Sequence, residues 1–178
     1  MNPVYLRPIQ LEDAASFETA FALQGWDKPR TQFERYYREQ QAGTRAVVVA
    51  EIDGTPVGYI TILPHKNAGP FAKTGWPELS DFNVLEAYQH CGIGTRLMEE
   101  AERIAFTQSD TITIGVGLHR GYGTAQRMYV RRGYIPDGSG VWYHDEPLAE
   151  NAPCLNDDDL VLYFSKKRTG CVLDETGL

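Results

Sequence analysis

The feature that most constrains the fold is a strand–turn–helix–strand stretch in the middle of the chain. Residues 79–85 are expected to form a strand, residues 93–106 a long amphipathic helix, and residues 111–116 a second strand rich in β-branched residues. The turn before the helix contains Gly92 and Gly94. A strand, a helix and a strand in this order predict a right-handed, locally parallel unit within one sheet.

Further strands and helices on either side extend this unit. Strands are expected at residues 4–7, 44–52, 55–63, 134–135, 141–144 and 160–165, and helices from Leu11, at 31–40 and at 124–132. Asp53-Gly54 predicts a two-residue hairpin, because glycine tolerates the positive backbone angle of this turn. The loop at 64–77 holds three prolines and two glycines and is long enough to shape a substrate mouth.

The order of these elements predicts an α/β (α+β) fold with a mixed central β-sheet flanked by helices on both faces. The passage around the helix at 124–132 is expected to be a second locally parallel unit. The length of 178 residues fits one domain, which we place at residues 1–166, followed by a C-terminal tail at 167–178.

Charge and composition narrow the class of partner. A formal net charge of -7 argues against nucleic-acid binding and gives no support for a membrane-binding basic patch. No apolar run is long enough to cross a bilayer and residues 1–7 lack the character of a signal peptide, so we expect a cytoplasmic protein. Cys91, Cys154 and Cys171 match no zinc or redox pattern, and no metal is expected.

The glycine turn at residues 89–95 predicts a binding site for an anion. The first N–H groups of a helix have no partner within the helix, and the helix dipole is positive at this end. Glycines also remove side chains that would block the approach of a phosphate. The turn is not a Walker A loop, because no Gly-Lys-Ser/Thr follows, and it lacks the third glycine of a dinucleotide fingerprint.

Two motifs resemble those of the GNAT acyltransferase superfamily. Gln89-His90-Cys91-Gly92-Ile93-Gly94 is similar to the family signature Gln/Arg-x-x-Gly-x-Gly/Ala, and residues 125–134 resemble the family segment Ala-x-x-Leu-Tyr-x-x-x-Gly-Phe/Tyr. The hairpin with residues 56–59 and the opening residues 6–8 also resemble family elements, so the resemblance extends to about Lys166. The chain departs from the family pattern at Tyr122, where the family often has Asn, and at Cys91, where it often has a basic residue or glycine.

The resemblance implies acetyl-CoA as co-substrate and the residues that would bind it. The pyrophosphate would lie on the turn formed by Gln89, His90, Cys91, Gly92, Ile93, Gly94 and Thr95. Backbone groups of Phe82, Asn83 and Val84 would pair with the pantetheine arm like an extra strand, and a bulge would point an N–H near Val84 at the thioester oxygen. Ala125 and Tyr129 complete this set, and Tyr129 would protonate the leaving thiolate.

The general base stays open between Glu78 and Asp81, at the start of a strand where the family often places a carboxylate. The two-residue period of a strand puts them on opposite faces, so that only one faces the cleft unless the strand is bulged, and Glu78 is favoured. His65 and His119 are fallback candidates. Aromatic residues that either line the acceptor site or pack the core are Trp26, Tyr36, Tyr37, Phe71 and Trp76.

The resulting hypothesis is an N-acetyltransferase that moves an acetyl group from acetyl-CoA to the primary amine of a small molecule or peptide, by direct attack in a ternary complex. The alternatives are a non-catalytic acyl-CoA-binding or regulatory module on the same fold and a nucleotide-phosphate binder that uses the glycine turn. The sequence does not identify the acceptor. Family members are often dimers, so a homodimer fits the resemblance, but the sequence locates no interface.

Overall fold

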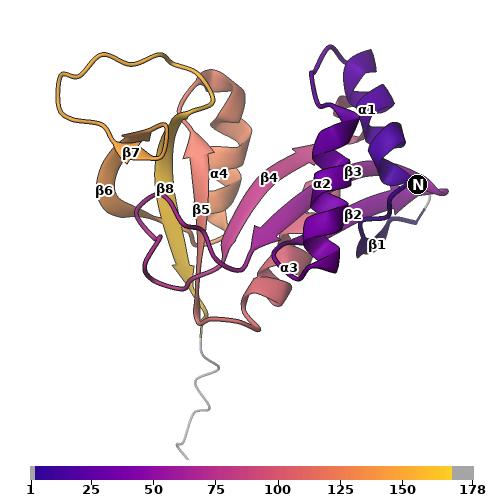
Figure 1. The fold of residues 1–178 in the computed structure, drawn as a ribbon, viewed down its shortest axis with the longest axis horizontal. Coiled ribbons are helices and arrows are strands. Elements are labelled where there is room, and N and C mark those ends of the chain that lie inside the picture. The colour runs from indigo at the N-terminus through magenta and orange to yellow at the C-terminus, as the bar shows by residue number, and fades with distance from the viewer. Residues whose placement is uncertain (1–2, 170–178) are drawn as a thin grey trace, which may run out of the picture.

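The sheet contains eight strands in the order β1-β2-β3-β4-β5-β8-β6-β7 (Figure 1). The structure is a computed structural model that describes residues 3–169. The strands are β1 (Tyr5–Pro8), β2 (Ala46–Ile52), β3 (Thr55–Leu63), β4 (Glu78–Val84), β5 (Thr111–Gly117), β6 (Ile135–Tyr143), β7 (Glu146–Pro147) and β8 (Leu160–Lys167). Neighbouring strands are antiparallel except β4 and β5, which are parallel, so the expected mixed sheet is confirmed.

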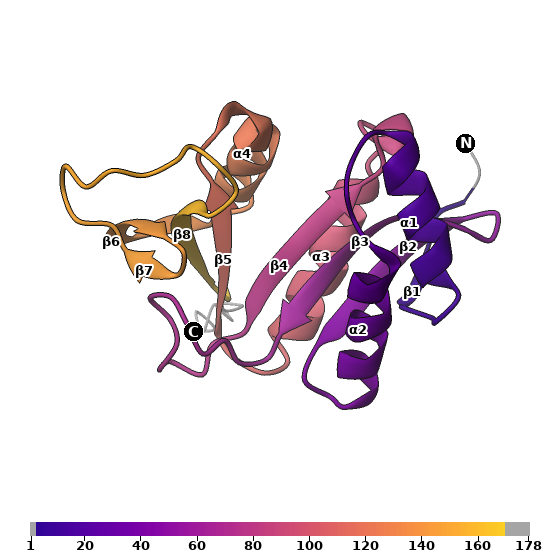
Figure 2. The same ribbon diagram turned by 45° about the horizontal axis from the view of Figure 1, so that its top comes forward.

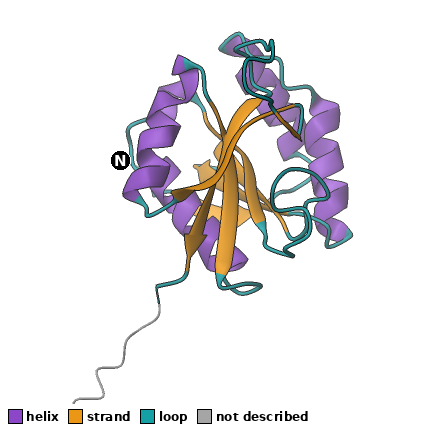
Figure 3. Ribbon diagram, turned by 90° about the vertical axis from the view of Figure 1, so that its left-hand side faces the viewer, coloured by secondary structure: helices purple, strands orange, loops and turns teal. Residues whose placement is uncertain are grey.

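Helices cover both faces of the sheet, as predicted (Figure 3). They are α1 (Asp13–Leu23), α2 (Arg30–Gln41), α3 (Ile93–Ala105) and α4 (Gly123–Arg131), with short 3-10 helices η1 (Glu86–Tyr88) and η2 (Arg120–Tyr122). On one face, α1 and α2 pack through Phe17, Phe33 and Tyr59, whose ring centroids lie 4.9, 5.1 and 5.3 Å apart. On the other face, residues of α3 and α4 share a second core cluster with β4. No helix within residues 3–169 has both the length and the apolar character needed to span a membrane.

The parallel strands β4 and β5 separate soon after they meet. Their ladder pairs only Glu78 with Thr113 and Leu79 with Ile114. Beyond this point the two strands diverge toward the N-termini of α3 and α4, which Figures 1 and 2 show as an opening V. The sheet is therefore open at its centre, between two halves that are each held by antiparallel pairing.

A β-bulge interrupts β4 beside this opening. Thr61 of β3 pairs with Ser80, but the next pair joins Tyr59 to Asn83, so that two residues of β4 stand opposite one residue of β3. The first of these two, Asp81, has a φ of 42°, in the left-handed region that non-glycine residues rarely adopt. The bulge places Asp81 on the face of the sheet that carries α1 and α2. Its carboxylate accepts hydrogen bonds there from Tyr36 and Tyr59.

Most predicted elements are present, and the differences are two short 3-10 helices and the strands at the C-terminal end. Residues 134–135 and 141–144 belong to one interrupted β6, in which Gly138 and Gly140 have positive φ. The short β7 and both 3-10 helices have no predicted counterpart. The Asp53-Gly54 hairpin is confirmed. β8 lies between β5 and β6, so these two mutually parallel strands do not pair with each other. β8 reaches Lys167, and residues 170–178 of the expected tail, Cys171 included, lie outside the described residues.

Candidate active site

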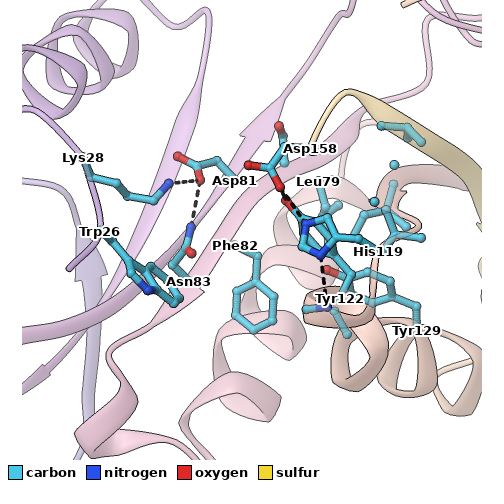
Figure 4. Close-up of a pocket in the computed structure, with 18 of the residues that line it drawn as sticks. Trp26, Lys28, Leu79, Asp81, Phe82, Asn83, His119, Tyr122, Tyr129 and Asp158 are labelled. Carbon is cyan, nitrogen blue, oxygen red and sulfur yellow. Dashed lines mark hydrogen bonds and ion pairs between the residues drawn. The ribbon is translucent and has the colours of Figure 1, made fainter. Parts of the chain in front are cut away.

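The divergence of β4 and β5 opens a cleft of about 740 Å³ (Figure 4). The α1–α2 loop, β4, β5 with the turn after it, α4 and the loop before β8 all contribute to its lining. Of the residues predicted as catalytic or cofactor-binding, the cleft brings together Asp81, Phe82, Asn83, Ala125 and Tyr129. Among the described residues, Glu78, Val84 and the glycine turn are not part of this lining.

One edge of β4 is free along this cleft. β4 pairs with β3 on one side, but in the described chain no strand pairs with residues 80–84 on the side of β5. Backbone N–H and C=O groups on such an edge can bind an extended ligand as an additional strand would bind. Gly58 allows β3 to lie close to the bulge in β4, because it has no side chain. A Cβ at this position would lie 2.9 Å from the carbonyl oxygen of Asn83.

Tyr129 reaches the cleft from α4. Ala125 and Tyr129 are four residues apart, so they lie on the same face of α4, and both line the cleft. The Tyr129 side chain is 4% exposed, and its hydroxyl has no hydrogen-bond partner within residues 3–169. Burial and the nearby Tyr122 raise the pKa of Tyr129 well above its ordinary value, so the hydroxyl keeps its proton at neutral pH.

The carboxylate of Asp81 is fully occupied by protein donors. Oδ2 accepts hydrogen bonds from Tyr36 (2.7 Å), Tyr59 (2.8 Å) and the Gln32 amide (2.8 Å). Oδ1 accepts from Lys28 Nζ (2.8 Å) and from the amide of Asn83 (2.8 Å). Burial alone would raise the pKa of Asp81, but Lys28 and the two tyrosines outweigh burial and lower it. A carboxylate with five donors and a lowered pKa is poorly suited to remove a proton from an amine.

Glu78 has the opposite environment. Its side chain is buried, 5% exposed, and its Oε1 lies 3.1 Å from Nζ of Lys66 in the β3–β4 loop. Lys66 also contacts Asp145 (3.1 Å) and donates to the hydroxyl of Tyr163 (2.9 Å). Burial raises the pKa of Glu78, and the positive charge of Lys66 opposes this only in part. The bulge, which the prediction from strand period allowed for, puts Asp81 on the same face of the sheet as Glu78, but of the two carboxylates only Asp81 lines the cleft.

The glycine turn opens onto solvent at the start of α3. Gly92 is the N-cap of α3 with a φ of 79°, and a Cβ at this position would have no atom within 4 Å. Gly94 faces the other way, because a Cβ there would lie 3.2 Å from the Phe82 ring, so this glycine lets α3 approach β4. The space beside Gly92 at the start of α3 is therefore open, as a phosphate site at a helix N-terminus requires.

Two side chains of the turn contact backbone carbonyl groups of the protein itself. Gln89 donates to the carbonyl oxygen of Val84 at 3.0 Å, which ties the turn to the end of β4. The Cys91 thiol is exposed and contacts the carbonyl oxygen of Gln89 at 3.3 Å. His90 adopts a φ of 60°. An anion at this turn would therefore rely on backbone N–H groups more than on the side chains of Gln89 and Cys91.

A basic groove of about 450 Å³ runs from Thr95 of α3 along α4. It is lined by Thr124, Arg127, Met128, Arg131 and Arg132 in addition to Thr95. Arg132 is paired with Glu102 at 2.9 Å, whereas Arg127 and Arg131 are exposed and form no ion pair within the described chain. Two uncompensated arginines beside a helix N-terminus favour a ligand with more than one phosphate group.

Sequence reasoning missed a polar group on the far wall of the cleft. Asp158 Oδ1 accepts hydrogen bonds from Tyr122 (2.9 Å) and from Nε2 of His119 (2.9 Å), while Nδ1 of His119 accepts from the amide of Gly121 (3.1 Å). Both His119 nitrogens are engaged, which weakens His119 as a fallback base. The departure at Tyr122 was visible in the sequence, but its partner is 36 residues away along the chain.

The candidate aromatic residues divide between the cleft and its surroundings. Trp26 lines the cleft, and Tyr36 holds Asp81. Phe71 packs on Trp76 and on Tyr163, with ring centroids 5.7 and 6.1 Å apart, and so fixes the β3–β4 loop against β8. Within residues 3–169 no cluster of three His, Cys, Asp or Glu side chains could hold a metal ion.

Known proteins provide an independent comparison. The model of the acetyltransferase (GNAT) family matches residues 11–134. No protein with a curated description matches the sequence. An N-acetyltransferase from Staphylococcus aureus Mu50 is similar in structure, with a TM-score of 0.68 and 14% identity over 93% of this chain and 99% of that chain.

Two further solved structures contain the coenzyme. PaiA N-acetyltransferase from Thermoplasma acidophilum, in complex with coenzyme A, has a TM-score of 0.61 and 16% identity over 93% of this chain and 99% of its own. YncA from Salmonella typhimurium, with its cofactor acetyl-CoA, has a TM-score of 0.66 and 15% identity over 93% of this chain and 94% of its own. At these identities the likeness shows a shared fold.

Proposed function

The chain belongs to the acetyltransferase (GNAT) family, and from this premise we propose that it transfers an acetyl group from acetyl-CoA to the primary amine of an acceptor, by direct attack in a ternary complex. The observation that carries the proposal is the cleft between β4 and β5, where the free edge of β4 and the unpartnered hydroxyl of Tyr129 line one space. A site of this kind can hold a thioester between a backbone donor and a proton donor.

Three features of the protein bind successive parts of acetyl-CoA. The pantetheine arm pairs with the free edge of β4, where Phe82 and Asn83 line the cleft. The pyrophosphate lies on the amides at the start of α3, around Gly92. The exposed Arg127 and Arg131 of the basic groove take the remaining phosphate charge.

Acetyl transfer forms one C–N bond and breaks one C–S bond. The neutral acceptor nitrogen attacks the thioester carbon, and its surplus proton leaves through water to Glu78, which the β3–β4 loop buries outside the cleft. Tyr129 donates its hydroxyl hydrogen to the sulfur as negative charge develops there. The raised pKa of Tyr129 favours hydrogen-bond donation over permanent loss of this proton.

A Gly92→Val variant tests the phosphate site. The φ of 79° is strained for a β-branched residue, and the new side chain would project into the open space where the phosphate is proposed to bind. We expect acetyl-CoA affinity, measured by isothermal titration calorimetry, to fall by about ten-fold or more, the value of one lost charge-assisted hydrogen bond. Gly43→Val carries the same backbone strain at a φ of 73° in the α2–β2 connection, so it controls for strain alone and should retain affinity.

A Glu78→Gln variant tests the base. Since the pKa of Glu78 is raised, activity should increase with pH as Glu78 ionises, and this acid limb should be absent in the variant, with kcat reduced by about 10²-fold. Lys66→Met removes the charge that lowers the pKa of Glu78, so it should move the acid limb to higher pH. Lys73→Met, an exposed residue of the same loop, is the control. An unchanged acid limb in Glu78→Gln would mean that the proton leaves by another route.

The function as a whole is tested by the release of coenzyme A from acetyl-CoA with a panel of primary amines. Amine-dependent release, with acetylated amine detected by mass spectrometry, supports the proposal. Tight binding of acetyl-CoA without release for any amine would instead support a non-catalytic acyl-CoA-binding module.

A further inference from the structure

The wall of the cleft opposite the α1–α2 loop presents one free carboxylate oxygen. Both protein donors to Asp158, Nε2 of His119 and the hydroxyl of Tyr122, bond to its Oδ1. Within residues 3–169, Oδ2 has no partner, and Asp158 lines the cleft. In Figure 4, Asp158 and His119 lie across the cleft from Lys28 and Trp26.

Neighbouring acids of the same loop are turned elsewhere. Asp157 accepts from Tyr143 (3.3 Å) and from the amide of Asp159, and Asp159 pairs with His144 (3.2 Å). Neither Asp157 nor Asp159 lines the cleft. The fixed bonds to His119 and Tyr122 therefore single out Asp158, among three consecutive acids, as the one held against the cleft.

The charges that line the cleft are unbalanced. Three carboxylates line it, those of Asp27, Asp81 and Asp158, against one ammonium group, Lys28. Lys28 is already paired with Asp81 at 2.8 Å. Lys28 is thus the only lysine or arginine among the described residues that line the cleft, and its ion pair is with Asp81 and not with Asp158.

The nitrogen that attacks the thioester cannot supply this balance. It must be neutral when it reacts, so it cannot form an ion pair with Asp158 at that moment. The unpartnered hydroxyl of Tyr129, which is 4% exposed and lies on the same side of the cleft as Asp158, marks where the reacting end of the ligand belongs. An ion pair between the acceptor and Asp158 therefore needs a second, cationic group on the same acceptor.

We propose that the acceptor is a dication: an amine with a second, non-reacting ammonium group that binds Oδ2 of Asp158, while His119 and Tyr122 hold this carboxylate in place. The inference rests on the proposed function and adds the class of acceptor to it. It assigns His119 and Tyr122 as positioning residues and excludes acceptors with a negative charge at the far end. An exposed carboxylate gives a modest effect, so we expect about ten-fold discrimination, as for one charge-assisted hydrogen bond.

The test compares amines that differ only at the end remote from the reaction. Putrescine and cadaverine are paired with butylamine and pentylamine, and ε-aminocaproate carries a carboxylate at the far end. For the full chain with saturating acetyl-CoA, kcat/KM for at least one diamine should exceed that of its monoamine by about ten-fold, beyond the doubling due to two equivalent nitrogens. The aminocarboxylate should be the poorest acceptor, and added salt should reduce the preference.

Asp158→Asn is the matched variant, because its carbonyl oxygen retains both bonds from His119 and Tyr122 and only the charge is lost. It should abolish the preference for the diamine over its monoamine, whereas Asp159→Asn, at a residue that does not line the cleft, should keep this preference. Equal turnover of diamines and monoamines by the wild type, or a preference that survives Asp158→Asn, overturns the inference alone. No release of coenzyme A with any amine overturns the proposed function and the inference with it.

Discussion

Tyr129→Phe is expected to lower kcat by a factor on the order of 10²–10⁴ while the KM for acetyl-CoA changes little, because the substitution removes only a proton donor that acts as the C–S bond breaks. The hydroxyl of Tyr129 lines the cleft and bonds to no group within residues 3–169, so its removal breaks no protein contact. The Phe ring fills the same space between α4 and the sheet. Initial rates of coenzyme A release over a range of acetyl-CoA concentrations give both constants.

Tyr134→Phe provides the matched control for this prediction. Tyr134 is as buried as Tyr129, and the two ring centroids lie 5.9 Å apart, but Tyr134 does not line the cleft. Removal of its hydroxyl should leave kcat unchanged. A loss of activity that is equal in both variants would point to packing of α4 as the cause, and full activity in Tyr129→Phe would exclude proton donation by Tyr129.

The parts of the fold that follow from the sequence are those whose signals are local. The α3 stripe, the Asp53-Gly54 hairpin and the strand before the glycine turn are each specified by residues within one short window, and the structure confirms them. The insertion of β8 between β5 and β6 depends on which strand pairs with which, and no local pattern records this choice. The interrupted β6 was read as two strands for the same reason, since its continuity comes from pairing with β8.

The candidate site shows the same limit. Motif positions such as Tyr129 and Ala125 are brought into the cleft, because their spacing on α4 fixes a common face. The base could not be assigned from strand period alone, since the bulge in β4 shifts the period by one residue at Asp81. Asp158 reaches the cleft only through the β7–β8 loop, whose path the sequence does not encode in any periodic pattern.

The bulge explains why Asp81 is a positioning residue in this interpretation. The left-handed backbone at Asp81 is unfavourable by itself, and the five hydrogen bonds to its side chain from α2, β3, β4 and the α1–α2 loop supply the compensating energy. The same bonds hold the α1–α2 loop at the mouth of the cleft through Lys28. Removal of this carboxylate should therefore act on stability first and on activity through the shape of β4.

Asp81→Asn is expected to lower the free energy of unfolding by about 2–4 kcal/mol at pH 7. In the variant, an NH₂ group replaces one carboxylate oxygen and faces hydrogen-bond donors that bond to the carboxylate in the wild type, such as Tyr36 and Gln32. Lys28 also loses its ion-pair partner. The effect depends on pH with a definite sign. The folded protein lowers the pKa of Asp81, so its contribution is present above the unfolded pKa of about 4 and is lost as the pH falls through the lower folded value. Urea titrations at several pH values should show the gap between wild type and variant narrowing below about pH 4.

Asp27→Asn is the control for this experiment, since Asp27 lines the same cleft but is exposed and has no ion pair within the described chain. It should leave the urea midpoint within experimental error of wild type. In Asp81→Asn the acid limb of the activity profile should keep its position even as activity falls, because in the proposed mechanism the proton goes to Glu78 and not to Asp81. Loss of that limb in Asp81→Asn with unchanged stability would make Asp81 the base, and the hydrogen bonds that saturate it would then have to open during turnover.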